Sequence, residues 1–303
     1  MRRYCMPHRH FAVTVALVIL VAGCAHRTPY RDPLFFETLG SDTELMVTMR
    51  VDEDKGLIAY MLDAGQLGNA DYIISRAERI SVAARTAPDG EGPSFYGGIE
   101  GNFSKLFMSL GLRAASEWER QRDGFVFYES PATGFEVAIP KSGIILFSDS
   151  SMGDVYSRMT SERVIYVPPE VSKQLEAAEI AFYAAHPDGM NLMGERVSLP
   201  FALYFDELWV MVNRVTHVHG ETPGEEKPLY WIDGVITLPE DVQARVFDRV
   251  IRLLYQEYMI KQQMTVDDWR RTIAKRDHAV VFDKLLVYED LIIDLVRIAA
   301  GVN

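Results

Sequence analysis

Short apolar segments separated by turn residues dominate the first half of the chain. They have the length of strands and are rich in β-branched and aromatic residues, so they predict β-strands. The predicted strands are residues 44–51, 79–85, 94–100, 118–122, 125–130, 135–139 and 144–148. Asp123-Gly124 lies between two of them, and this dipeptide supplies the positive φ values of a tight hairpin. The pattern therefore predicts an antiparallel sheet.

Two segments of the same half predict helices. Residues 56–77 have helical periodicity, interrupted near Gly65 and Gly68. A second helix is expected from Asn102, a good N-cap residue, through Leu110, and Gly111 is expected to end it. These helices are expected to cover one face of the predicted sheet.

The second half of the chain resembles the first at an offset of 135 residues. The offset places Glu44-Leu45 on Glu179-Ile180, Arg79-Ile80-Ser81 on Arg214-Val215-Thr216, Pro93 on Pro228, and Phe95-Tyr96 on Tyr230-Trp231. Residues 241–262 predict a helix that corresponds to the one at 103–110, and residues 285–300 predict a last helix. An accidental likeness between two amphipathic segments is the alternative to a duplication.

These patterns together predict an α+β fold with two tandem related units, residues 42–160 and 161–303. Each unit is expected to be an antiparallel sheet backed by helices, because the order of its elements is compatible with a ferredoxin-like sandwich.

The N-terminal residues have the three parts of an export signal. Arg2, Arg3 and Arg9 give a basic start without any acidic residue. The apolar run from Phe11 to Val21 follows, and at this length it is too short to span a bilayer, which needs about 20 apolar residues. We therefore expect a cleaved signal peptide at residues 1–23.

The run ends in Leu20-Val21-Ala22-Gly23-Cys24, which resembles the lipobox of bacterial lipoproteins. The resemblance implies cleavage before Cys24, attachment of a diacylglyceryl group to its sulfur, and acylation of the new amino terminus. An ordinary secretory signal that happens to carry a cysteine is the alternative. Residues 24–41, rich in Pro, Gly and charge, are then a tether between the membrane and the folded body.

Charge and cysteine content narrow the classes of function. Removal of residues 1–23 takes away three arginines and no acidic residue, so the net charge of −12 becomes −15. An acidic surface repels phosphate backbones, which argues against nucleic-acid binding. Cys5 leaves with the signal and Cys24 is expected to be lipidated, so the mature chain has neither a thiol nor an internal disulfide.

His217, His219 and Glu221 form the sharpest local cluster of chemically capable residues. If residues 215–219 form a strand, the two imidazoles lie on one face, and imidazoles with a carboxylate are ligands that Zn²⁺ accepts. A solvated or packed histidine pair is the alternative, since no third ligand has the spacing of a known metal motif. Apart from this low-ranked zinc site, no cofactor is expected: the glycines of residues 95–102 lack a nucleotide-binding spacing.

Three functions remain after these exclusions. The favoured one is a lipid-anchored protein of the bacterial cell envelope, facing the periplasm or the cell exterior, which binds another envelope component, most simply a protein, without catalysis. A metal-binding protein or metal-dependent enzyme that uses His217 and His219 is the second. A surface-exposed adhesin or ligand binder is the third.

Overall fold

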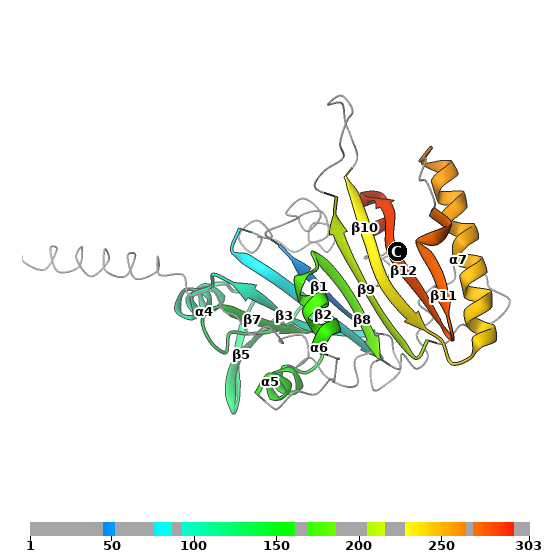
Figure 1. Cartoon of the computed structure of the whole chain (residues 1–303). Coiled ribbons are helices and arrows are strands. Elements are labelled where there is room, and N and C mark those ends of the chain that lie inside the picture. Colours follow the sequence, from blue (N-terminus) through cyan, green and yellow to red (C-terminus); the bar gives the residue numbers. More distant parts are fainter. Residues whose placement is uncertain are drawn as a thin grey trace, which may run out of the picture.

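A single large antiparallel sheet forms the framework of the protein (Figure 1). The computed structural model describes residues 45–51, 75–86, 93–160, 169–185, 205–215, 228–264 and 269–293. Within these residues the strands are β1 (Leu45–Arg50), β2 (Ala77–Thr86), β3 (Pro93–Gly101), β4 (Glu119–Asp123), β5 (Phe125–Glu129), β6 (Glu136–Ala138), β7 (Ile144–Ser148), β8 (Ile180–Ala185), β9 (Glu207–Arg214), β10 (Leu229–Thr237), β11 (Ile273–Arg276) and β12 (Ala279–Tyr288). The helices are α4 (Lys105–Ala114), α5 (Met152–Thr160), α6 (Pro169–Ala177) and α7 (Asp241–Lys261), with a 3₁₀ turn η2 (Trp269–Arg271).

The strand order shows two arms that meet in the middle of the sheet. The order is β11-β12-β10-β9-β8-β1-β2-β3-β7-β6-β5-β4. Strands β1 and β8 are antiparallel neighbours, with Val47 opposite Phe182 and Met49 opposite Ile180. The first half of the chain extends from β1 toward β4, and the second half extends from β8 toward β11. The α+β class and the antiparallel sheet backed by helices are thus confirmed, as one continuous sheet in which each arm begins with three consecutive neighbouring strands.

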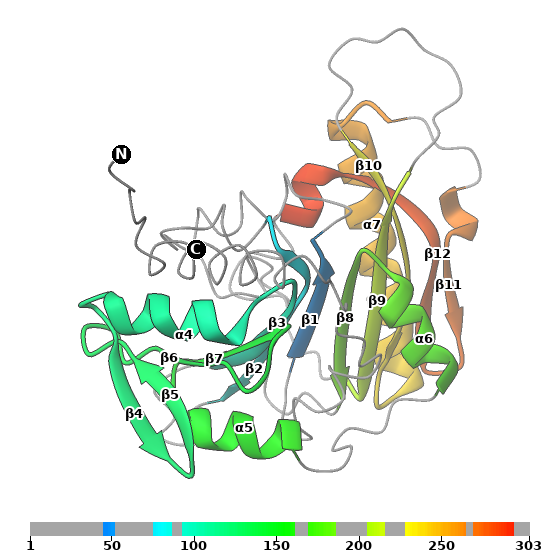
Figure 2. The same ribbon diagram turned by 90° about the vertical axis from the view of Figure 1, so that its left-hand side faces the viewer.

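Both faces of the sheet are buried, because side chains along a strand alternate between them. Leu45, Val47 and Met49 of β1 belong to one core, whereas Met46 belongs to the other. Helix α7 packs on the first face, and α5 and α6 pack on the second face. Figure 2 shows α6 in front of β8 and β9, with α7 behind the sheet. The described part of the fold therefore has three layers, helix, sheet and helix.

Strand prediction succeeded in the first half of the chain, and two helix boundaries need correction. The predicted hairpin is present between β4 and β5, where Gly124 has a φ of 68°. Helix α4 begins at Lys105 and not at Asn102, because Asn102 N–H still bonds to the carbonyl of Arg76 and Phe103 is buried in the core. Gly111 lies inside α4 and donates its carbonyl to the helix end as an acceptor for Ala115 N–H.

The predicted first and last helices are described only at their margins. Residues 52–74 of the helix expected at 56–77 lie outside the described residues, and Ala77 already belongs to β2. In the segment expected to be helical from Leu285, residues 285–288 instead extend β12, where they pair with β10. Residues 289–293 are helical, and residues 294–303 lie outside the described part. Pairing to a neighbouring strand overrides the helical pattern at residues 285–288.

The predicted offset of 135 residues fits the strands unevenly. Strands β1 and β8 have equal lengths at this offset, and β3 and β10 have equal lengths at an offset of 136. The alignment of Arg79 with Arg214 is wrong, because Arg79 lies near the start of β2 and Arg214 ends β9. A duplication stays a prediction.

Candidate functional site

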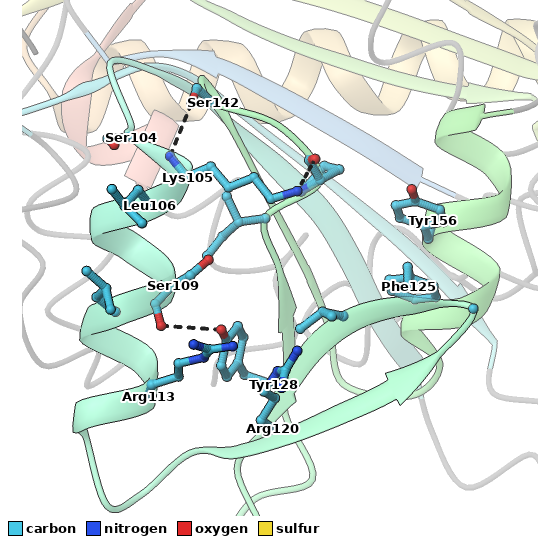
Figure 3. Close-up of a pocket in the computed structure, with 15 residues that line it drawn as sticks. Ser104, Lys105, Leu106, Ser109, Arg113, Arg120, Phe125, Tyr128, Ser142 and Tyr156 are labelled. Atoms are coloured by element: carbon cyan, nitrogen blue, oxygen red, sulfur yellow. Dashed lines mark hydrogen bonds between the residues drawn. The ribbon is translucent and has the colours of Figure 1, made fainter. Parts of the chain in front are cut away.

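A pocket of about 760 Å³ lies at the end of the first arm of the sheet. Helix α4, the β4–β5 hairpin, the loop between β6 and β7, and α5 surround it (Figure 3). Its lining combines cationic, hydroxyl and apolar side chains. The lining residues are Ser104, Lys105, Leu106, Ser109, Leu110, Arg113, Arg120, Gly124, Phe125, Val126, Tyr128, Ile139, Pro140, Ser142 and Tyr156. No acidic residue is among them, although the whole chain has a net charge of −12.

Helix α4 supplies a polar row and an apolar row to this pocket. Lys105, Ser109 and Arg113 are spaced by four residues, so they lie on one side of the helix. Leu106 and Leu110 form the adjacent row and remain 55% and 49% exposed. The helix buries none of its residues completely. It therefore stands over the sheet with functional groups directed at the pocket.

Strand β4 contributes Arg120 through the alternation of its side chains. In the sequence Glu-Arg-Gln-Arg-Asp, the acidic ends and the glutamine point to one side and both arginines to the other. Arg120 lies opposite Tyr128 of β5, which also lines the pocket. Figure 3 shows Arg113 of α4 and Arg120 of β4 on either side of Tyr128. Two guanidinium groups are thus directed at the same end of the pocket.

The arginines of the pocket have no ion-pair partner among the described residues. The ion pairs described there join Arg245, Arg252 and Lys275 to Asp241 or Asp248, all in the second half of the chain. Lys105 uses one donor of its ammonium group, which donates to the carbonyl of Pro140 at 2.8 Å. Three cationic groups therefore face one space without a carboxylate in its lining, which creates a locally positive potential.

Contacts between its walls fix the shape of the pocket. The ring of Phe125, at the start of β5, stacks on Tyr156 of α5 with centroids 4.1 Å apart and an interplanar angle of 3°. The Tyr128 hydroxyl donates to the carbonyl of Ser109 at 3.3 Å, which ties the hairpin to α4. The backbone N–H of Lys105 donates to the Ser142 hydroxyl oxygen at 3.2 Å. Hairpin, helix and loop are consequently held around a preformed space.

The sites predicted from the sequence fall elsewhere. Cys24 lies outside the described residues, and so do His217, His219 and Glu221. Strand β9 ends at Arg214, before the strand that the histidine prediction assumed. In the described part of the chain, no group of three His, Cys, Asp or Glu side chains is arranged to hold a metal ion. Zinc binding and lipidation at these residues stay predictions.

The glycine-rich segment of β3 has a structural role. A Cβ atom on Gly97 would lie 2.0 Å from the carbonyl oxygen of Ser81, so only glycine allows β2 to approach this closely. Gly234 of β10 has the same relation to Trp209 in the other arm, at 2.5 Å. This agrees with the sequence interpretation that residues 95–102 do not form a nucleotide site.

Sequence reasoning missed the cationic pocket. Two signals were present: the four-residue spacing of Lys105, Ser109 and Arg113, and the alternation of charge around Arg120. Neither signal says that the helix and the hairpin face each other, because they belong to separate elements.

Comparison with known proteins finds the same fold in solved structures of TP0453 from Treponema. Crystal form I of TP0453 has a TM-score of 0.60 at 14% identity, with 88% of this chain and 97% of that chain covered. Crystal form III has a TM-score of 0.59 at 14% identity, covering 88% and 98%. Crystal form IV has a TM-score of 0.57 at 13% identity, covering 86% and 95%. No protein-family model and no curated sequence matches the chain. At this identity the likeness is one of fold.

Proposed function

We propose that the protein is a lipid-anchored component of the bacterial cell envelope that binds another envelope component at the α4 pocket and does not transform it chemically. The single observation that carries the proposal is a preformed pocket with unpaired arginines beside exposed leucines. A concave site that mixes apolar walls with a few convergent polar groups is the usual form of a binding site.

Two further observations support the location in the envelope. Residues 1–24 resemble a lipoprotein signal that ends at Cys24. TP0453, which has the same fold, is a lipoprotein of Treponema. Among the described residues, no helix is long and apolar enough to cross a bilayer. A lipid attached to Cys24 is therefore the proposed means of membrane attachment.

The anchor is tested by replacing Cys24 with serine. Serine cannot form the thioether, so we expect the protein to leave the membrane fraction and to keep an unprocessed signal. Cell fractionation and the mass of the N-terminal peptide measure both effects. The matched control is Cys5→Ser, which changes the only other cysteine and is expected to leave processing unchanged. Normal processing and membrane association of Cys24→Ser would refute the lipid anchor.

The binding role is tested by affinity purification of the full-length protein from gently solubilised membranes, with mass spectrometry of both proteins and small molecules. We expect an envelope component to copurify with the wild type and to be lost with Leu106→Glu, which places a charge at the pocket mouth. Leu253→Glu is the matched control, because Leu253 is an exposed leucine of α7, far along the chain from the pocket. A component retained equally by both variants, or none at all, would contradict the proposal.

A further inference from the structure

We infer that the α4 pocket binds an organic phosphate, a ligand in which a phosphate group is attached to an apolar part. This inference rests on the proposed function and names the ligand class for the same pocket. It derives from three features of the pocket: its uncompensated positive charge, the hydroxyl groups beside that charge, and the apolar surface at its mouth.

The arginine pair calls for an anion. Arg113 and Arg120 approach one end of the pocket from different elements and have no ion-pair partner among the described residues (Figure 3). Like charges that converge repel each other, and a bound anion removes this repulsion. The planar guanidinium group donates two parallel hydrogen bonds to phosphate or carboxylate oxygens, so two of them can hold one anion from both sides.

The number of donors favours phosphate over a carboxylate. A phosphate monoester has a second pKa of about 6, so it is mostly a dianion with three acceptor oxygens at neutral pH. The pocket offers the ammonium group of Lys105 in addition to the two guanidinium groups. Ser142 accepts a bond from the Lys105 backbone N–H, which leaves its own hydroxyl hydrogen available as a donor. A carboxylate, with one charge and two oxygens, would leave part of this donor set without an acceptor.

The apolar part of the ligand is assigned to the mouth of the pocket. Leu106 and Leu110 are about half exposed on α4, and Val126, Ile139 and Pro140 extend the apolar surface on the opposite walls. Exposed apolar surface next to a polar site gains free energy when a ligand covers it. Inorganic phosphate alone would fill the cationic end and leave this surface in water.

The inference is tested by isothermal titration calorimetry of the full-length protein in a nonionic detergent. The probes are hexyl phosphate, inorganic phosphate and hexanol, which separate the anion from the apolar part. We expect hexyl phosphate to bind at least tenfold more tightly than either of the other two probes. Its affinity should fall by about ten- to one hundredfold in Arg113→Gln and in Arg120→Gln, as the loss of one or two charge-assisted hydrogen bonds implies.

Arg122→Gln is the matched control for these variants. Arg122 is an exposed arginine of the same strand and the same side as Arg120, but it does not line the pocket. It should leave the affinity unchanged within about twofold, because a rim or surface charge acts only through a screened field. Equal melting temperatures of all variants show that the changes act on binding and not on folding.

Several outcomes would overturn the inference. These are no heat with hexyl phosphate, equal affinity for hexanol and hexyl phosphate, equal affinity for inorganic and hexyl phosphate, or the same loss in Arg122→Gln as in Arg120→Gln. The proposed function is judged separately. If Leu106→Glu loses the copurifying component while Arg113→Gln and Arg120→Gln retain it, the binding role stands and the phosphate assignment is wrong.

Discussion

The helix that follows the third strand differs strongly between the two arms of the sheet. In the first arm, α4 has 10 residues, and none of them is buried. In the second arm, α7 has 21 residues and buries Ala244, Phe247, Tyr255 and Met259 against the sheet. Both helices come directly after a strand of nine residues, β3 or β10. The same position in the order of elements therefore carries a binding pocket in one arm and a packed core in the other.

This difference indicates how the protein divides stability and recognition between its arms. Helix α7 covers β11 and β12 and brings large apolar side chains into the core. Helix α4 keeps its leucines exposed, and its polar row lines a space that other elements hold open. A helix packed face-on leaves no pocket, whereas a helix held at one side of a hairpin does. The predictions below test this division, beginning with the largest effect.

Truncation of a buried aromatic of α7 should affect stability much more than truncation of one on α4. Phe247 is 1% exposed and its ring contacts Phe205 edge to face at 5.7 Å. Phe247→Ala should lower the free energy of unfolding by about 3 to 5 kcal/mol, because it leaves a cavity. Phe107 of α4 is 46% exposed, so Phe107→Ala should cost about 0.5 kcal/mol or less. Urea denaturation measures both, and equal losses would contradict the comparison.

Arg252 should be the most important charged residue of α7. Its Nε lies 3.0 Å from both carboxylate oxygens of Asp248, Nη1 donates to the carbonyl of Arg270 at 2.7 Å, and Nη2 donates to the carbonyl of Ile273. Arg252→Gln should therefore cost about 1.5 to 3 kcal/mol, since these carbonyls lose a charged donor.

The matched control is Arg245→Gln on the same helix. Arg245 pairs with Asp241 at 2.8 Å, but both side chains are at least half exposed, and water screens the interaction. The urea midpoint of this variant should equal that of the wild type. A midpoint lowered as far as in Arg252→Gln would show that surface charge, and not the bonds from α7 to the β11 segment, stabilises the second arm.

Alkaline pH should destabilise the second arm through Tyr255. Burial raises the pKa of Tyr255 to about 12, although its hydroxyl donates to the carbonyl of Leu286 at 2.9 Å. A raised pKa stabilises the folded state fully below the ordinary value of 10, and this contribution is lost as the pH rises toward 12. Tyr255→Phe should lower stability at pH 8 by about 1 kcal/mol and flatten its decline between pH 10 and 12. Thermal melts across this range test it; an unchanged decline would exclude Tyr255 as the cause.

Glu136 should produce the smallest effect, in the first arm. Burial raises the pKa of this carboxyl, and the negative charge of Glu129 on the neighbouring strand adds to the increase, while the N–H of Met152 opposes it. A raised pKa favours folding below the ordinary value of 4.5, and the contribution is lost as the pH rises through the higher value in the folded state. Glu136→Gln should therefore make the melting temperature slightly less dependent on pH above 4.5. Glu129→Gln should act in the same direction, whereas a steeper dependence in either variant would contradict this account.

Much of the framework was predictable because a strand in this fold announces itself locally. The strands at residues 44–51, 79–85 and 94–100 were predicted within a few residues, since alternation and turn residues define them without reference to distant parts of the chain. Helix boundaries were harder to predict. Asn102 is a good cap by type, yet the backbone there is still bonded to Arg76, a contact made across 26 positions of the chain.

The functional residues divide along the same line. The lipobox around Cys24 is a contiguous motif, so the sequence alone predicts it, together with the acidic charge and the absence of a thiol in the mature chain. The α+β class and the strands of the first arm also follow from local pattern. Only the tertiary structure places Arg113 beside Arg120, joins β1 to β8 in one sheet, and leaves α4 exposed while α7 is buried. These features depend on how separate elements pack, and local periodicity carries no information about which elements meet.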